Sequence, residues 1–493
     1  MTDAAAPVPD LAGIPASIPA TDPLAPYDAV LLLSYGGPRR PEDVLPFMRN
    51  ATAGRGVPDS RLLEVSGHYQ GFGGASPINA RNAELRDALQ ARLAERGSTL
   101  PVVVGNRNWH PFVSQALREL ANTGARHVLA LPTAAFGSYS GCRQYREDLA
   151  GAAALLAAGA DGSTGDGFEA DAAARVGGEG GAPVDLTVDK TRPYYNTPGL
   201  LEANVDAIVE AYGALAEQGV AAADVRLVLV THSIPLGMEA GSAPTPESDG
   251  ASESAGAGQS AGRPAGPREP GVAADLSTEV SYVAQHRALA AVLVPEVARR
   301  LGLEEVESDL VYCSRSGPPQ ARWLEPDVND HLEALAAGQL TDGSPADRPG
   351  GVVVAPFGFI SDHMEVVFDL DTEAAQTARD LGMPYARAAT VGTHPAFVDS
   401  LVDILIERAA VARGEDVHPA STTGVGPFHT VCPPSCCRSG AHHPGQHSHH
   451  GADGAAHESA ARHQPAAGGS CRPVSAEPES LKPASCGRMK EKR

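Results

Sequence analysis

The 493-residue sequence has no long hydrophobic run and no excess of basic residues. No apolar stretch approaches the roughly 20 residues that a transmembrane helix needs, so we expect no stable membrane insertion. Lysine and arginine number 38 against 60 aspartate and glutamate residues, which gives a formal net charge of -22. Because phosphate groups would be repelled by such a surface, the composition argues against nucleic acids and anionic membranes as partners.

Cysteine is scarce, and the sequence lacks two common targeting and binding motifs. No segment near the start joins basic residues to an apolar core, so we expect no secretory signal and a cytoplasmic protein. The seven cysteines are an odd number, which favours metal or cluster ligation over a disulfide framework in that compartment. No G-x-G-x-x-G follows the first expected strand, which argues against a nucleotide-binding Rossmann enzyme.

Glycine and proline are abundant, with 53 and 41 residues, and they concentrate in segments with few aromatics. Such segments cannot bury enough surface to offset the entropy of ordering them. We therefore expect four disordered stretches, namely a leader (1–26), an insertion and linker (156–190), a second insertion (241–275) and a His-rich tail (438–493). They separate three folded parts, namely an N-terminal domain (27–155), a C-terminal domain (191–395) and a closing helix with a cysteine motif (396–437).

The folded parts alternate short aliphatic runs with segments of helical periodicity. The runs predict strands at 27–34, 100–105, 127–131, 226–231, 308–313 and 351–357. The periodic segments predict helices at 79–95, 112–122, 199–218, 282–300 and 397–413. This alternation indicates an α/β fold of two similar Rossmann-like domains, each a parallel sheet flanked by helices, with a ligand cleft between them at the carboxyl ends of the strands.

Three carboxylates stand at a spacing of four residues just after the last of these strands. Glu365, Asp369 and Glu373 would lie on one helical face beside His363. Like charges at that spacing repel each other unless they are solvated or bridged by cations. The row is therefore either a solvated acidic face or a path for a metal ion.

His232 ends a predicted strand and precedes Ser-Ile-Pro. A single histidine in that position is often structural. Placed near Glu365, however, it would give one imidazole and one carboxylate, a ligand pair suited to transient Fe²⁺. An enzyme that delivers a metal needs an incomplete ligand shell, and a pair fits this better than a closed four-ligand site.

Five ordered blocks across about residues 27–413 resemble the signature sequences of ferrochelatases, especially the actinobacterial coproporphyrin III enzymes. They are YDAVLLLSYGGP (27–38), GGASPIN (73–79), THSIP (231–235), WLEPD (323–327) and FISDHMEVVFDLD (359–371). The resemblance implies a class II chelatase fold and insertion of Fe²⁺ into a porphyrin. His232 and Glu365 match the catalytic, metal-facing pair, whereas Asp369 and Glu373 match the acidic row that guides metal or protons.

The same resemblance implies contacts to the porphyrin. Tyr35 matches a tyrosine that approaches the macrocycle from the other face, and the remaining expected contacts are Thr52, Arg55, His68, Tyr69, Ser76 and Tyr145. His68 departs from the family pattern, in which arginine is common. Arg49 and Arg55 lie in the segment 41–58, which we expect to form a polar lip that pairs with the four propionates of coproporphyrin III.

Many actinobacterial relatives hold a [2Fe–2S] cluster with one internal and three C-terminal cysteines, and the sequence offers the same count. The resemblance therefore implies ligation by Cys142, Cys432, Cys436 and Cys437, although adjacent thiolates could equally hold zinc. Cys313 lies inside a predicted strand and is expected in the core.

Other functions remain open. They are protoporphyrin IX ferrochelatase, cobalt insertion into sirohydrochlorin, and heme or metal storage without catalysis. We expect a monomer whose partners are a porphyrin and Fe²⁺, with transient contacts to other heme-pathway enzymes.

Overall fold

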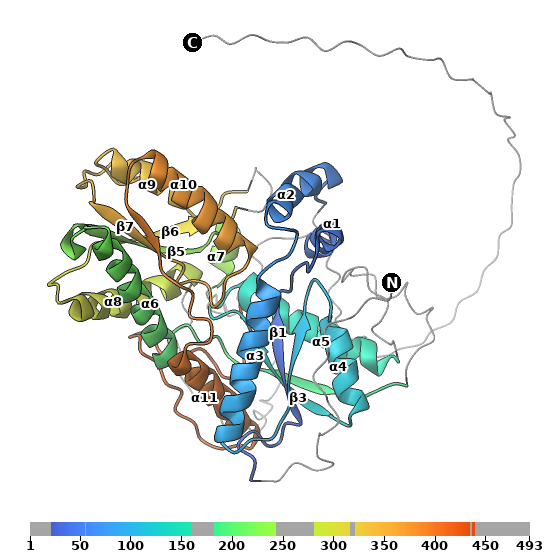
Figure 1. Ribbon diagram of the computed structural model, residues 1–493. Coiled ribbons are helices and arrows are strands. Elements are labelled where there is room, and N and C mark those ends of the chain that lie inside the picture. The colour runs from blue at the N-terminus through green and yellow to red at the C-terminus, as the bar shows by residue number, and fades with distance from the viewer. Residues whose placement is uncertain are drawn as a thin grey trace, which may run out of the picture. The chain divides into compact units, whose positions relative to one another are not determined.

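Two four-stranded sheets with the same strand order form the framework of the protein (Figure 1). The computed structural model describes residues 21–54, 56–159, 182–242, 281–315, 321–433 and 436–438. The first sheet has the order β2-β1-β3-β4 and the second β6-β5-β7-β8. The strands are β1 (Ala29–Ser34), β2 (Val102–Asn106), β3 (His127–Pro132), β4 (Thr187–Lys190), β5 (Val225–His232), β6 (Ser308–Cys313), β7 (Gly351–Ala355) and β8 (Tyr385–Arg387).

Every pairing between these strands is parallel. All six residues of β1 and all five of β7 are buried, as expected for parallel strands that are covered on both faces. In each sheet the first strand of the domain pairs with the second on one side and with the third on the other. This repeated order confirms the prediction of two similar Rossmann-like domains.

Helices cover both faces of each sheet. The α-helices are α1 (Val44–Ala51), α2 (Asp59–Gly71), α3 (Ile78–Glu95), α4 (Val113–Asn122), α5 (Gln144–Ala157), α6 (Pro198–Glu217), α7 (Leu236–Ser242), α8 (Tyr282–Leu301), α9 (Val328–Ala336), α10 (Ala375–Asp380) and α11 (Pro395–Ala412). Short 3₁₀ turns are η1 (Pro41–Asp43) and η4 (Ala222–Asp224), and π-helices are η2 (Tyr139–Arg143) and η5 (Val366–Ala374). The five predicted helices match α3, α4, α6, α8 and α11 to within two residues at each end.

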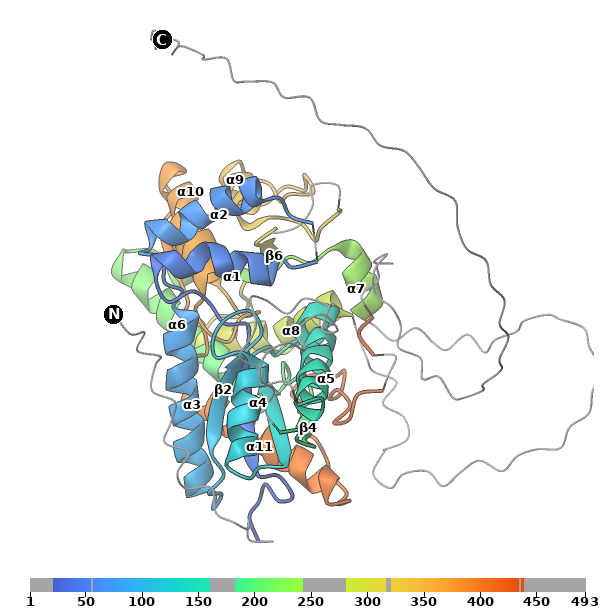
Figure 2. The same cartoon turned by 90° about the vertical axis from the view of Figure 1, so that its right-hand side faces the viewer.

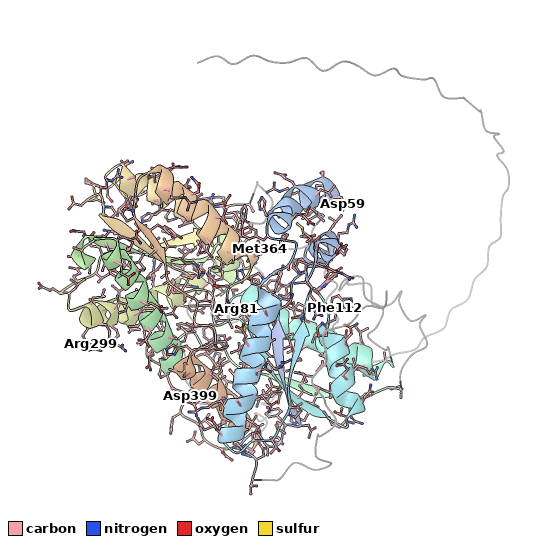
Figure 3. The ribbon with its side chains drawn as sticks, in the orientation of Figure 1. Asp59, Arg81, Phe112, Arg299, Met364 and Asp399 are labelled. Atoms are coloured by element: carbon pink, nitrogen blue, oxygen red, sulfur yellow. The ribbon has the colours of Figure 1, made fainter. Side chains whose placement is uncertain are left out.

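The two domains share one central core. Val30 and Leu32 of β1 belong to the same buried cluster as Leu227 and Leu229 of β5, and α3, α6, α8 and α11 contribute further residues to it. The outer face of the first sheet is covered by α4 and α5 (Figure 2), and that of the second by α9, η5 and α10. Asp399 of α11, labelled in Figure 3, forms an ion pair with Arg92 of α3. Because the core is shared, the domains are held against each other by apolar burial.

The boundaries of three predicted disordered stretches were wrong. Parts of these stretches are ordered by contacts with distant residues, which the local sequence does not indicate. The predicted linker 156–190 includes β4, which pairs with β3. The predicted leader 1–26 includes Leu24, which is fully buried, and the predicted insertion 241–275 begins inside α7. The remainder of the predicted disordered stretches lies outside the described residues. No helix in the described ranges is both long and apolar enough to cross a membrane.

Candidate active site

The carboxyl ends of two strands in the second sheet bring the predicted metal-facing residues together. His232 is the last residue of β5, and Glu365 precedes η5 in the segment after β7. Parallel strands end at one edge of a sheet, so their terminal residues converge there. Nε2 of His232 lies 3.5 Å from Oε1 of Glu365, and Nδ1 of His363 lies 3.7 Å from the other oxygen, Oε2. The predicted juxtaposition of His232 and Glu365 is confirmed.

The orientation of the His232 ring is set by its own main chain. Nδ1 lies 2.5 Å from the carbonyl oxygen of Ser233. A carbonyl oxygen only accepts hydrogen bonds, so Nδ1 carries the proton and donates it. In the neutral ring, Nε2 therefore presents its lone pair to Glu365 and to solvent, since 29 % of the His232 side chain is exposed. That nitrogen can take up a proton or bind a metal ion.

Opposite charge dominates the titration of this pair. Burial opposes ionisation of both side chains, but the neighbouring carboxylate outweighs it and raises the pKa of His232. Burial likewise opposes ionisation of Glu365, yet the positive charge and hydrogen bond of His232, with His363 beside it, lower its pKa to about 2. For His363 burial prevails, and its pKa is lowered. The site therefore favours a carboxylate at 365 at neutral pH.

The acidic row continues from this pair along the π-helix η5. Burial, with the charges of Glu365 and Glu373, raises the pKa of Asp369 to about 7 against a hydrogen bond donated by the Ser314 hydroxyl. Burial also raises the pKa of Glu373. The row therefore holds one partly buried group, Asp369, that titrates near neutrality, whereas Glu373 at its far end is exposed.

Backbone strain marks this site and one other. Within the described ranges, Ser314 and Cys437 are the residues other than glycine with positive φ, at 65° and 52°. L-residues rarely adopt that region, and such strain gathers at functional sites. Ser314 directly follows β6 and was not predicted as a site residue. Its place at the carboxyl end of a strand was the signal that could have identified it.

The N-terminal domain contributes aromatic residues to the same place. The His68 ring of α2 stacks on Phe368 of η5, with centroids 4.0 Å apart and planes 11° apart. Burial raises the pKa of Tyr69, and the charges of Glu365, Tyr35 and Asp369 add to that effect. Tyr35 follows β1 and is 38 % exposed. The structure thus gathers three of the expected porphyrin contacts near the metal-facing pair.

Three other expected contacts are either hydrogen-bonded within the protein or buried. The Thr52 hydroxyl donates to the Met48 carbonyl oxygen over 2.7 Å. Ser76 is 8 % exposed and Tyr145 is 5 % exposed. Arg55 lies outside the described residues. The roles of these four in porphyrin binding stay predictions.

Arg107 is a buried cation that the sequence reasoning missed. Its guanidinium carbon lies 4.6 Å from the ring centroid of Tyr145 and 5.9 Å from that of Tyr35. It forms an ion pair with Asp148, and both side chains are mostly buried. Arg107 directly follows β2, and its place at the carboxyl end of a strand was the signal that could have identified it. The arrangement places a fixed positive charge behind the exposed tyrosine.

A second site is formed by cysteines that are far apart in the sequence. Cys142 of η2 clusters with Cys432, Cys436 and Cys437, and all four are free thiols. The Lys190 ammonium donates to the Cys142 sulfur over 3.3 Å. The cations Arg143 and Arg146 donate to main-chain carbonyls of the cysteine motif. Cys313 is not part of this cluster and lies in the core, as predicted.

The cysteine site offers the donor atoms that an iron–sulfur cluster needs, but these atoms are not arranged around a common metal position. Hydrogen bonds from Cys432 and Cys437 lower the pKa of Cys142 well below its usual value, and Lys190 assists against burial. In the ranges described above, no set of three or more His, Cys, Asp or Glu side chains is arranged to hold a metal ion. Four sulfurs beside the partly buried Lys190 cation fit a [2Fe–2S] group in number and type of donor, but the side chains would have to rearrange around it.

Together, the two parallel-sheet domains and the histidine–carboxylate pair with an acidic approach define a metal-handling α/β enzyme. The sequence profile of ferrochelatases matches residues 27–409, and the chain belongs to the ferrochelatase family. A protein of Streptomyces coelicolor named coproporphyrin III ferrochelatase is 42 % identical over 85 % of this chain and 96 % of its own length. Proteins of the same name from Streptomyces griseus and Leifsonia xyli are 43 % and 39 % identical, over 84 % and 85 % of this chain and 94 % and 92 % of their own.

Proposed function

We propose that this enzyme inserts Fe²⁺ into coproporphyrin III and so forms coproheme in heme biosynthesis. The observation that carries the proposal is the 3.5 Å approach of His232 to Glu365 at the head of the acidic row. The relatives named coproporphyrin III ferrochelatase, which match nearly their whole length, support the choice of substrate. A two-residue metal site that leaves most of the coordination sphere open suits an ion that must be passed on.

The reaction exchanges one Fe²⁺ for two pyrrole protons, so the site has to accept protons while it holds a cation. His232 offers Nε2 as a base or as a metal ligand. Asp369, whose pKa lies near 7, can release a proton when Fe²⁺ arrives and take one when the pyrroles are deprotonated. Glu365 stays ionised throughout, because its pKa is about 2, and supplies the fixed negative charge that attracts the metal.

Anaerobic assays with Fe²⁺ and separate porphyrins test the proposal. We expect kcat/KM, followed through the Soret band, to be about tenfold higher for coproporphyrin III than for protoporphyrin IX, because two additional exposed charge pairs each contribute roughly 0.2–1 kcal/mol. A preference for protoporphyrin IX would contradict the substrate but not the reaction. Cobalt insertion into sirohydrochlorin without iron insertion would favour the second chelatase function, and binding without turnover would favour storage.

The polar lip is the expected source of this preference. Arg49 is paired with Asp59 over 2.6 Å, and both side chains are more than half exposed. An exposed pair of this kind is weak, so a propionate can replace the Asp59 carboxylate. The variant Arg49→Gln is expected to lower kcat/KM for coproporphyrin III several-fold and to leave that for protoporphyrin IX less affected. Equal losses for both porphyrins would assign the preference elsewhere.

We also propose that the cysteine site holds a [2Fe–2S] cluster ligated by Cys142, Cys432, Cys436 and Cys437. The support is the clustering of four free thiols, one of which accepts a hydrogen bond from the partly buried Lys190 ammonium. When bound, such a group supplies one-electron redox chemistry. The residues themselves tie the C-terminal motif to η2, and Lys190 offsets part of the negative charge of the thiolates.

The expected location and state of assembly follow from composition. The acidic composition favours a cytoplasmic monomer that meets its heme-pathway partners transiently. Cell fractionation and sedimentation velocity test these two expectations. A stable dimer, or recovery of the protein outside the cytoplasm, would contradict them.

A further inference from the structure

The first turn of α8 lies behind His232 and faces both domains. Tyr282, Gln285 and His286 stand three and four residues apart and therefore project from one side of the helix. All three are buried, with exposed fractions of 7 %, 0 % and 0 %. Polar side chains so deeply buried need specific partners.

On the side of the second sheet, the partners are at the end of β5. The Tyr282 hydroxyl donates to the main-chain oxygen of His232 over 3.1 Å and lies 2.8 Å from the Thr231 hydroxyl. Nδ1 of His286 donates to the Tyr282 carbonyl oxygen over 2.7 Å, so Nε2 of the neutral ring accepts from Thr231 over 2.8 Å. Tyr282 and His286 of α8 thus hold both terminal residues of β5, Thr231 and His232, by hydrogen bonds.

On the side of the first sheet, the partners lie in the loop that follows β3. The Gln285 amide accepts from the Gly137 nitrogen over 2.7 Å and donates to the Gly137 oxygen over 2.9 Å. The His286 ring stacks on Phe136, with centroids 3.7 Å apart and planes 9° apart. A side chain at Gly137 would collide with Phe428, because an added Cβ would lie 2.7 Å from its ring. The loop is therefore packed closely against Phe428 on one side and bonded to α8 through Gln285 on the other.

We propose that Tyr282, Gln285 and His286 are positioning residues that hold the main chain of His232 in register with the N-terminal domain. The inference rests on the proposed function, since the distance that matters is the one from the His232 imidazole to the porphyrin held against the N-terminal residues Tyr35 and Tyr69. A catalytic group displaced by about 1 Å can lose roughly two orders of magnitude in rate. The shared apolar core sets the general packing of the domains, whereas these directional bonds set the position of one strand end.

The sharpest test is Tyr282→Phe, which removes one hydroxyl and keeps the ring. We expect kcat for iron insertion to fall about fivefold, as for the loss of one hydrogen bond, while KM for coproporphyrin III is unchanged. The second variant is Gln285→Met, which frees the loop at Gly137 and should have the same kinetic signature with a larger effect. Arg287→Ala is the matched control, because Arg287 is exposed on the same turn, and it should match the wild type.

A measurement without turnover separates this inference from the proposed function. Co²⁺ binding is titrated in the absence of porphyrin through its visible absorption, and only the portion lost in His232→Ala is counted. Tyr282→Phe should weaken that portion several-fold and leave porphyrin quenching intact. If wild-type protein binds Co²⁺ but does not insert iron, the proposed function fails and the Co²⁺ result still decides the inference. A lowered Tm with unchanged kcat and unchanged Co²⁺ affinity would show a purely structural role and overturn it, and should Gln285→Met not fold, Tyr282→Phe alone decides.

Discussion

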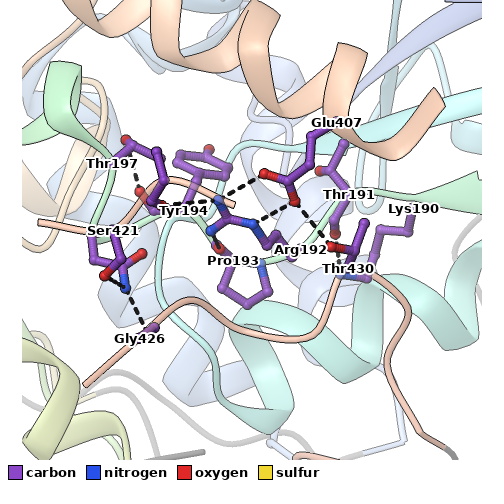
Figure 4. Close-up of polar contacts among 12 residues, drawn as sticks. Lys190, Thr191, Arg192, Pro193, Tyr194, Thr197, Glu407, Ser421, Gly426 and Thr430 are labelled. Carbon is purple, nitrogen blue, oxygen red and sulfur yellow. Dashed lines mark hydrogen bonds and ion pairs between the residues drawn. The ribbon is translucent and has the colours of Figure 1, made fainter. Parts of the chain in front are cut away.

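Arg192 and Glu407, which are 215 residues apart, form a two-pronged buried ion pair (Figure 4). Nε of the guanidinium donates to Oε1 over 2.7 Å and Nη2 donates to Oε2 over 3.0 Å. The Thr430 hydroxyl donates to the same carboxylate over 3.0 Å. The pair therefore ties the segment after β4 to α11 and to the chain that leads into Cys432. The cysteine site depends on this anchor for its position.

The first prediction concerns this ion pair. The Arg192 side chain is 1 % exposed and that of Glu407 is 11 % exposed. Arg192→Leu would leave a buried carboxylate without its partner, so we expect the free energy of unfolding to fall by about 3–5 kcal/mol in urea denaturation. The control is Arg299→Ala, which breaks a surface pair with Glu296 and should lower the free energy of unfolding far less. Equal effects of the two variants would contradict the buried-pair interpretation.

The second prediction concerns the metal-facing pair. His232→Ala should lower kcat for iron insertion by at least about a hundredfold, since it removes the base or ligand at Nε2. Glu365→Gln should also lower turnover severely, because the carboxylate next to Nε2 is lost. Porphyrin quenching and Tm should stay close to those of the wild type in both variants. Near-normal turnover in either one would refute the catalytic assignment, and the exposed Glu217→Gln variant serves as the control.

The third prediction is a pH dependence governed by Asp369. Its pKa of about 7 means that the carboxyl is neutral in acid and attracts no Fe²⁺. The value of kcat/KM should therefore rise as the pH increases through about 7, and the Asp369→Asn variant should lose this limb. The charged neighbours that face Asp369 are Glu365, Glu373 and His232. Substitution of any one of these neighbours should leave part of the rise of kcat/KM with pH.

Stability gives an independent check on the same group. A carboxyl whose pKa is raised on folding stabilises the protein below its unfolded value of about 4, and this contribution is lost as the pH rises through about 7. Asp369→Asn should consequently gain in Tm relative to the wild type as the pH increases over that window. A Tm difference that does not vary with pH would show that Asp369 has an ordinary pKa.

The fourth prediction concerns the cysteine site. Cys437→Ser should abolish the visible absorption of anaerobically purified protein and lower its Tm, because ligation of a cluster contributes to folding. Lys190→Met should retain the absorption but shift the midpoint potential to more negative values, since the reduced cluster carries one more negative charge. Cys313→Ala, in the core, should change neither the visible absorption nor the midpoint potential. Zinc in place of iron and sulfide in the wild-type protein would refute the cluster.

Much of the framework could be predicted from the sequence because the signals are local. Aliphatic runs and helical periodicity identified six of the eight strands, and the order of the ferrochelatase blocks identified His232 and Glu365. The strands β4 and β8 were missed, since TVDK and YAR are short and lack an aliphatic run. Only pairing with a neighbouring strand makes such segments β-structure.

The sequence by itself determined the two parallel sheets, the residue types at their carboxyl ends and the spacing of the acidic row. Hydrophobic patterning and strand polarity suffice for these features. The tertiary structure decided which distant groups meet: Arg107 beneath Tyr35, Ser314 on Asp369, Lys190 on Cys142, and the first turn of α8 behind His232. Buried polar and charged side chains must find partners wherever the fold supplies them, and no local pattern specifies a partner that lies dozens of residues away in the sequence.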